Sequence, residues 1–457
     1  MIHSSITSKK GGKMDRREFA KSLTALAFAG LAGCTARGLG ASVSSADLVL
    51  DPEGVIDLPR GYAYRVISRA GDAMDDGHVV GDRADGMGCF ALDRHRVALV
   101  RNHELQVKHH GSGPFGERAV ALAYDRTNDG RALPGGTSTL IYDLRRGRVE
   151  AQYQSLAGTI RNCSGGITPW GSWLTCEEDV TRAGNGVARD HGWVFEVPAA
   201  HKGLVEPVPL TAMGRFNHEA AAVDPATGIV YLTEDRDDSL FYRFLPARRG
   251  ELAAGGRLQA LAFVEPGLDD TRNWSEVTLP RGTGRPVRWV DLDGTHSPDD
   301  DLRLRGHAAG AARFARGEGV HFGNGSIYFC CTSGGTAKLG QVMRYRPSKA
   351  EGQAGERTSP GTLQNFVESS DPALFNFGDN LTVAPNGHLV VCEDQYSLIV
   401  NNHLRGVTPA GDLYTLGRCR QQTELAGACF SPDGSTLFVN LYSPAMTLAI
   451  TGPWGSA

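Results

Sequence analysis

A cysteine and several acidic residues stand at the ends of short apolar runs in this sequence. Residues 162–179 show the pattern most clearly: Cys163 lies near the start of one run, a Pro-Trp-Gly turn follows, and the returning run ends in Glu177 and Glu178. This order predicts a β-hairpin. In an antiparallel hairpin the two open ends lie side by side, so with the turn centred on Trp170 we expect Cys163 to face Glu177. A thiolate beside carboxylates can bind a metal ion.

The same hairpin pattern recurs in five further stretches, of which the first four carry acids at their ends and the last carries none. These stretches are Asp85–Glu104, Glu219–Asp235, Glu318–Ser333, Asp379–Asp394 and Ala428–Asn440. A single hairpin cannot bury both of its faces, so the repeats predict an all-β fold, a six-bladed β-propeller. Its hairpins point the same way, so the acids should converge at one end of the central channel. Clustered carboxylates repel one another, which favours a cation between them.

Length and composition are compatible with one such domain. A propeller can use residues 46–457 as a single unit, and 58 glycines among 457 residues fit many short strands joined by turns. The segment from Pro246 to Phe314 is long and charged, and we expect a loop insertion over the channel mouth. A net charge of −4 without a polybasic arm gives no case for nucleic-acid binding. We expect a monomer.

Residues 1–45 are interpreted as an export signal and a linker. Asp15–Lys21 looks like a twin-arginine signal, and the apolar stretch Leu23–Ala32 is too short to span a bilayer. Leu31–Cys34 is similar to a bacterial lipobox, so Cys34 is a candidate for lipidation; the alternative is an ordinary signal that is cleaved nearby. We therefore expect passage through the twin-arginine export machinery to the periplasm or the medium, with Cys34 as a candidate membrane anchor.

A series of motifs between Pro59 and Trp454 follows a recognisable order. The motifs are Asn162–Gly166, Trp173–Glu178, Arg215–Glu219, Tyr231–Asp235, Phe314–Gly319, Asp379–Val383, Cys392–Asp394 and Phe430–Gly434. Together they resemble the PhoX family of exported bacterial alkaline phosphatases. The resemblance implies a six-bladed propeller that holds a cluster of iron and calcium and hydrolyses phosphate esters.

The resemblance also implies a set of metal-binding residues. Carried over to this sequence, the set is Cys163, Glu177, Glu219, Glu234, Glu318, Asp379, Glu393 and, with less support from the motifs, Glu104. The carboxylate oxygens in this set suit calcium. The thiolate suits iron or zinc better.

Two basic residues are candidates for phosphate binding. The motif around Arg316 implies that its guanidinium holds a substrate phosphate through two parallel hydrogen bonds. The alternative for Arg316 is an ion pair that holds Glu318. Lys338 follows a Gly-rich turn and is the second candidate, against the more ordinary interpretation of a surface lysine.

The sequence therefore predicts an exported, metal-dependent alkaline phosphatase that acts on a small phosphate ester. It contains no Gly-x-Ser-x-Gly elbow and no Walker loop. Two alternatives stay open because a fold does not fix a function. One is a calcium-dependent propeller hydrolase acting on phytate or on a lactone. The other is a non-catalytic propeller that binds partners in the cell envelope.

Overall fold

The structure is a computed structural model that describes residues 48–116, 118–395 and 397–454. The interpreted twin-arginine signal and the Cys34 lipobox lie outside the described residues. Strands dominate the described ranges, and their only α-helix is α2 (Leu302–Ala308). Short 3-10 helices are η1 (Val107–Ser112), η2 (Thr211–Met213), η3 (Leu252–Ala254) and η4 (Ala354–Arg357). Within these ranges, no helix has the length and apolar character that crossing a membrane requires.

The described strands form five hydrogen-bonded sheets. The first two have the orders β4-β5-β6-β7 and β10-β9-β8. Their strands are β4 (Ala84–Ala91), β5 (Arg96–His103), β6 (Gly135–Asp143), β7 (Arg148–Thr159), β8 (Asn162–Ile167), β9 (Ser172–Glu177) and β10 (Val194–Pro198). The third sheet is nine-stranded, in the order β11-β12-β13-β14-β15-β19-β18-β17-β16. It comprises β11 (His218–Val223), β12 (Val230–Glu234), β13 (Tyr242–Pro246), β14 (Gly256–Phe263), β15 (Gly284–Leu292), β16 (Gly317–Gly323), β17 (Ser326–Cys331), β18 (Gln341–Arg346) and β19 (Thr362–Glu368).

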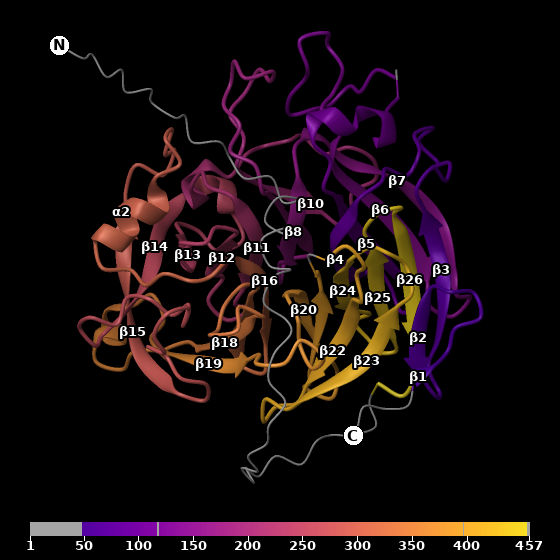
Figure 1. Cartoon of the computed structure of the whole chain (residues 1–457). Coiled ribbons are helices and arrows are strands. Elements are labelled where there is room, and N and C mark those ends of the chain that lie inside the picture. The colour runs from indigo at the N-terminus through magenta and orange to yellow at the C-terminus, as the bar shows by residue number, and fades with distance from the viewer. Residues whose placement is uncertain (1–47, 117, 396, 455–457) are drawn as a thin grey trace, which may run out of the picture.

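The last two sheets bring the chain ends together. Their orders are β1-β2-β23-β22-β21-β20 and β24-β25-β26-β3. Their strands are β1 (Leu48–Val49), β2 (Ile56–Pro59), β3 (Ala63–Arg69), β20 (Gly378–Val383), β21 (Leu389–Glu393), β22 (His403–Val407), β23 (Leu413–Cys419), β24 (Leu425–Phe430), β25 (Thr436–Leu441) and β26 (Met446–Thr451). The C-terminal strand β26 pairs with β25, and β3 completes that sheet from the other end of the chain. Figure 1 shows indigo β3 beside yellow β26.

Six inner strands surround the centre of the described chain. They contact one another in the cyclic order β4, β8, β11, β16, β20 and β24, and β24 contacts β4 again. The inner strands approach closely, since a Cβ on Gly166 of β8 would lie 1.9 Å from the carbonyl oxygen of Ala221 in β11. Glycine is therefore required where these strands pack. Apolar clusters fill the space between neighbouring sheets, and another lies between the two groups of strands of the nine-stranded sheet. The predicted all-β, propeller-like fold is confirmed (Figure 1).

The segment from Pro246 to Phe314 differs from its prediction as a loop insertion. It contains the strands β14 and β15, and α2 follows them. Residues 284–286 of β15 pair with residues 362–364 of β19, which joins two groups of strands into the nine-stranded sheet. The described residues consequently form five hydrogen-bonded sheets where the sequence predicted six separate blades.

Candidate metal centre

The hairpins that begin at the inner strands share one irregularity. In each hairpin, one or two pairs at the open end are followed by a register shift in the inner strand, which is a β-bulge. The outermost pairs are Ala84↔His103, Asn162↔Glu177, His218↔Glu234, Gly317↔Cys331, Gly378↔Glu393 and Leu425↔Leu441. The repeat therefore places equivalent residues of every hairpin at equivalent points around the centre.

Acids occupy two of these equivalent positions. One is the second residue of an inner strand, and the other is the residue directly after the partner strand. A small space at the centre is lined by acids, one thiol and one guanidinium, which we call the acidic cluster: Asp85, Glu104, Cys163, Glu178, Glu219, Asp235, Arg316, Glu318, Asp379, Asp394 and Glu424. Glu424 directly precedes β24, so the sixth hairpin, in which no acid was expected, also contributes one.

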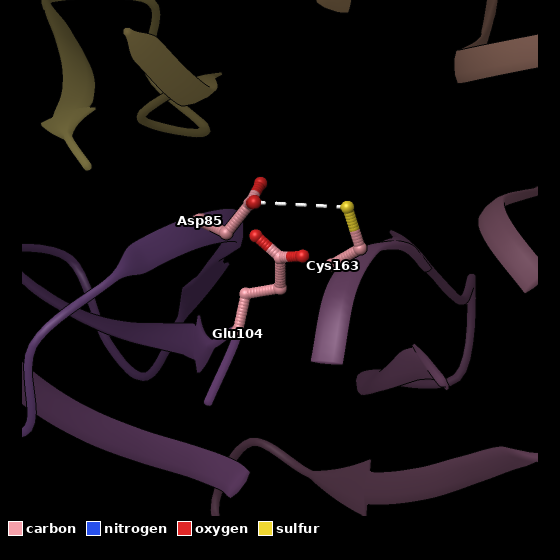
Figure 2. Close-up of side chains that lie close together, drawn as sticks. All are labelled: Asp85, Glu104 and Cys163. Atoms are coloured by element: carbon pink, nitrogen blue, oxygen red, sulfur yellow. Dashed lines mark hydrogen bonds between the residues drawn. The ribbon is translucent and has the colours of Figure 1, made fainter. Parts of the chain in front are cut away.

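Potential ligand atoms in the acidic cluster lie close together. Four groups have ligand atoms within 4.8 Å of one another: Asp85, Glu104 and Cys163; Cys163, Glu178 and Glu219; Glu219, Glu318 and Asp379; and Asp379, Asp394 and Glu424. Figure 2 shows the first group, whose side chains point toward one another. The Cys163 Sγ lies 3.7 Å from the Asp85 Oδ2. Because neighbouring groups share a residue, the cluster is continuous.

Burial and mutual repulsion oppose ionisation in the acidic cluster. Burial, and then the charges of neighbouring acids, raise the pKa of Asp85, Glu219 and Glu318 well above their ordinary values. Burial and the carboxylate of Asp394 raise the pKa of Asp379 to about 7. Burial and the neighbouring acids, Asp85 first, raise the pKa of the Cys163 thiol. Polyvalent cations would reverse these shifts by stabilising the ionised forms.

Two acids lack the hydrogen bonds that buried carboxylates usually accept. Among the described residues, neither carboxylate oxygen of Glu219 has a hydrogen-bond partner of normal geometry, although the Cys163 thiol lies beside it. The Asp85 Oδ1 is likewise without a hydrogen-bond partner in the described chain. Buried polar atoms of this kind require an explanation, and a bound ion is one. Carboxylate oxygens with one thiolate form a donor set suited to hard cations and one softer metal.

The structure brings five of the eight predicted metal-binding residues into the acidic cluster. These are Cys163, Glu219, Glu318, Asp379 and Glu104. It does not bring Glu177, Glu234 and Glu393 there, because each is the last residue of its strand and is held by other groups.

These three acids are held by hydrogen bonds and ion pairs to residues outside the acidic cluster. Glu177 accepts hydrogen bonds from the backbone amides of Ile160, Gly192 and Trp193 and contacts the His191 ring. Glu234 accepts from the Tyr242 hydroxyl, and Arg303 lies 3.7 Å from it. Glu393 pairs with Arg405 and His403.

A difference of one residue in register separates the predicted from the observed set. The predicted pairing placed Cys163 opposite Glu177, whereas the observed partner of Glu177 is Asn162. Successive side chains of a strand point in opposite directions, so the next residue, Glu178, takes the place beside Cys163. Asp235 and Asp394 replace Glu234 and Glu393 in the same way. Asp85 and Glu424 were also missed, although Asp85 opened a predicted hairpin.

Arg316 borders the acidic cluster and is bound to two of its acids. Its Nε and Nη2 donate to both carboxylate oxygens of Asp235 at 2.7 and 2.8 Å, and Nη2 donates to Glu318 Oε1 at 3.0 Å. The ion pair with Glu318, stated above as the alternative role, is therefore present. Lys338 does not line the cluster: it is exposed, and its Nζ lies 4.8 Å from the centroid of the Trp274 ring.

The remaining cysteines lie outside the acidic cluster. The eight cysteines of the described ranges are buried, and none of them forms a disulfide there. Cys176, for example, packs in an apolar cluster with Leu174 and Val194. Cys163 is the thiol that lines the acidic space, which distinguishes it from the cysteines of the core.

Comparison with known proteins gives one family. A family model described as alkaline phosphatase PhoX matches residues 43–151 and 133–445. Among solved structures, the chain is similar to Pseudomonas fluorescens PhoX in complex with vanadate, a transition-state analogue, at 20% identity and a TM-score of 0.66, over 91% of this chain and 98% of that one. It is more distantly similar to a gluconolactonase from Xanthomonas campestris, at 13% identity and a TM-score of 0.41, over 92% of this chain and 100% of that one. Among curated proteins, none matches the sequence.

Proposed function

The chain belongs to the alkaline phosphatase PhoX family, and from this premise we propose that it is an exported phosphomonoesterase that works with iron and calcium. The family and the hydrolase class predicted from the motifs are confirmed. The observation that carries the proposal is the acidic cluster, because nine acids, six of them buried, meet at one point together with a single thiol. We also infer a six-bladed propeller, with the nine-stranded sheet read as two blades joined through β15 and β19.

The donor set fits the proposed metals. Glu219 and Asp85 have carboxylate oxygens without hydrogen-bond partners in the described chain, and the raised pKa values of their carboxyl groups indicate uncompensated negative charge. Cys163 would hold iron together with acids that lie near its sulfur, and the remaining acids would hold calcium. When bound, these metals would supply Lewis-acid stabilisation of the phosphate charge and an activated oxygen nucleophile.

The protein's own groups would orient the phosphate. Arg316 borders the enclosed space, and Asp235 fixes the plane of its guanidinium through two hydrogen bonds. A guanidinium held in this way can donate to phosphate oxygens as negative charge develops on them. The acids repel an anionic substrate, so they also confine the phosphate to positions where cations neutralise it.

The proposed export rests on the sequence motif alone. We infer that Asp15–Lys21 directs the chain to the twin-arginine machinery and that Cys34 is the point of lipid attachment or lies near the cleavage site. Export in the folded state would allow the metals to be loaded before the protein leaves the cytoplasm. The proposed location is the periplasm or the medium.

A pair of cysteine variants tests the proposed function. Cys163→Ser removes the thiol of the acidic cluster, whereas Cys176→Ser changes a buried thiol outside it and serves as the matched control. We expect C163S to lose iron and the hydrolysis of p-nitrophenyl phosphate at alkaline pH, while C176S keeps both. Full iron and full activity in C163S would overturn the assignment. Wild-type protein that contains calcium but never iron would favour the calcium-dependent alternative.

A further inference from the structure

Arg161 is a second cation at the acidic cluster, and the proposed reaction does not use it. It lies two residues before Cys163, and its guanidinium contacts acids from two neighbouring hairpins. Its Nε lies 2.8 Å from Glu104 Oε1, its Nη1 donates to the Glu178 carbonyl oxygen at 3.0 Å, and its Nη2 pairs with the Glu178 carboxylate. The side chain is only 14% exposed. Arg161 therefore joins two acids in a buried position.

The backbone of Arg161 is anchored to the same two hairpins. Its amide donates to the Leu105 carbonyl at 3.0 Å, and its carbonyl accepts from the Glu178 amide at 2.9 Å. Its φ of +46° lies in the left-handed region, which non-glycine residues seldom adopt. Neighbouring structure must fix such a conformation. The position of the guanidinium is therefore set by both its backbone and its side-chain contacts.

The equivalent residue of another hairpin clarifies the role. Arg316 lies two residues before Glu318, has a φ of +54°, and joins Asp235 to Glu318. Arg316 is among the residues that line the enclosed space, whereas Arg161 is not among them. At the corresponding position before Asp379 stands Phe377, which also has a positive φ of +55° but carries no charge. Arg83, two residues before Asp85, is another arginine with a positive φ, of +56°. Because Phe377 is uncharged, the backbone repeat alone does not require a cation at position 161.

We propose that Arg161 is a positioning residue that acts as a permanent counter-ion for Glu104 and Glu178. It fixes both carboxylates and removes one unit of negative charge that bound ions would otherwise have to neutralise. A buried carboxylate without a counter-charge is unfavourable, and two of them beside each other are more so. Arg161 thereby limits the number of polyvalent cations that the cluster takes up. This inference rests on the proposed metal-dependent function.

Counting bound ions in two variants tests the inference. Arg161→Gln removes the charge, and Arg161→Lys keeps it. After dialysis against calcium, we expect R161Q to hold one more divalent cation per chain than the wild type, measured by elemental analysis, and R161K to hold the wild-type number. The thermal midpoint of R161Q should also rise more on calcium addition than that of the wild type. Arg96→Gln, which breaks an exposed ion pair with Asp93, is the control and should change neither quantity.

A double variant keeps the test decisive if R161Q does not fold without metal. Glu104→Gln combined with R161Q removes one negative and one positive charge, so folding without metal should return and the additional divalent cation of R161Q should be lost. An R161Q protein with the wild-type or a smaller ion count, and a calcium response equal to that of the wild type, would overturn the inference. So would a double variant that stays unfolded or an R161K with an altered count. A wild-type protein without polyvalent cations would instead overturn the proposed function.

Discussion

The two adjacent acids at the end of β21 should respond in opposite ways to loss of their charge. Glu393 is fully buried, and it accepts from Arg405 Nε at 2.7 Å and from the Asn376 amide at 2.9 Å. Asp394 lines the acidic cluster with Asp379 and Glu424. The substitutions Glu393→Gln and Asp394→Asn each remove one charge and keep the size of the side chain. They are therefore matched controls for each other.

The expected magnitudes follow from these contacts. Glu393→Gln leaves the buried guanidinium of Arg405, whose side chain is 2% exposed, without its carboxylate. Breaking a buried ion pair in this way costs about 3–5 kcal/mol in the free energy of unfolding. Asp394→Asn relieves repulsion between acids, so the metal-free protein should be as stable as the wild type or more stable. With one anionic ligand fewer, its affinity for calcium should fall at least about tenfold.

Two measurements decide between the roles. Urea unfolding in the presence of a chelator gives the stability of each metal-free variant, and elemental analysis of the folded fraction gives its ion content. We expect E393Q to be unstable but normally loaded, and D394N to be stable but poorly loaded. If E393Q instead keeps its stability and loses ions, while D394N keeps its ions, the placement of these acids is refuted.

Further predictions concern phosphate binding and pH. Arg316→Lys keeps a charge but loses the planar pair of donors. A lost charge-assisted hydrogen bond is worth about 1.5–3 kcal/mol, which predicts a roughly 10- to 100-fold lower kcat/KM for p-nitrophenyl phosphate. An unchanged kcat/KM would exclude Arg316 from phosphate binding. Burial alone would lower the pKa of His191, but Glu177 and Asp125 raise it to about 9 from its ordinary 6.5. The stabilisation from protonated His191, about 3 kcal/mol, is therefore complete below pH 6.5 and is lost as the pH rises through 9. Chemical unfolding at several pH values should show this decrease in the free energy of unfolding, and His191→Gln should not show it. Asp379 has its pKa raised to about 7 from 3.8, so the metal-free protein should lose stability between about pH 4 and pH 7, and calcium should remove that dependence; equal slopes with and without calcium would contradict it.

Much of the fold could be predicted because turns and apolar runs mark the hairpins. The turn at Asp224–Gly228, for example, separates strands that the structure contains as β11 and β12. The pairing of β3 with β26 joins segments at opposite ends of the chain, and no local pattern indicates it. The strands β14 and β15 were not predicted, because their segment is rich in charged residues and was interpreted as a loop. A sheet with one solvent-exposed face can carry such residues on that face.

The acidic cluster could be predicted only in part, for a reason that lies in the register. The motifs located the correct ends of the correct strands, but a β-bulge adds residues to one strand without changing the hydrophobic pattern. That addition in β8 makes Asn162 the partner of Glu177, where an unshifted register would have paired Cys163 with it. Glu424 could not be found from its own hairpin because it stands before the first paired residue of β24. The shared position of Arg161 and Arg316, two residues before a buried ligand candidate, was visible only in the structure.

The central claim is that cations held by the acidic cluster are required for phosphate-ester hydrolysis. The most direct measurement is the hydrolysis of p-nitrophenyl phosphate at alkaline pH by freshly purified protein, before chelation, after chelation and after the return of calcium, with the metal content determined at each stage. We predict that the fresh protein contains iron and calcium, that chelation removes calcium and activity together, and that calcium restores activity. Full hydrolysis by protein that holds no polyvalent metal would contradict the account.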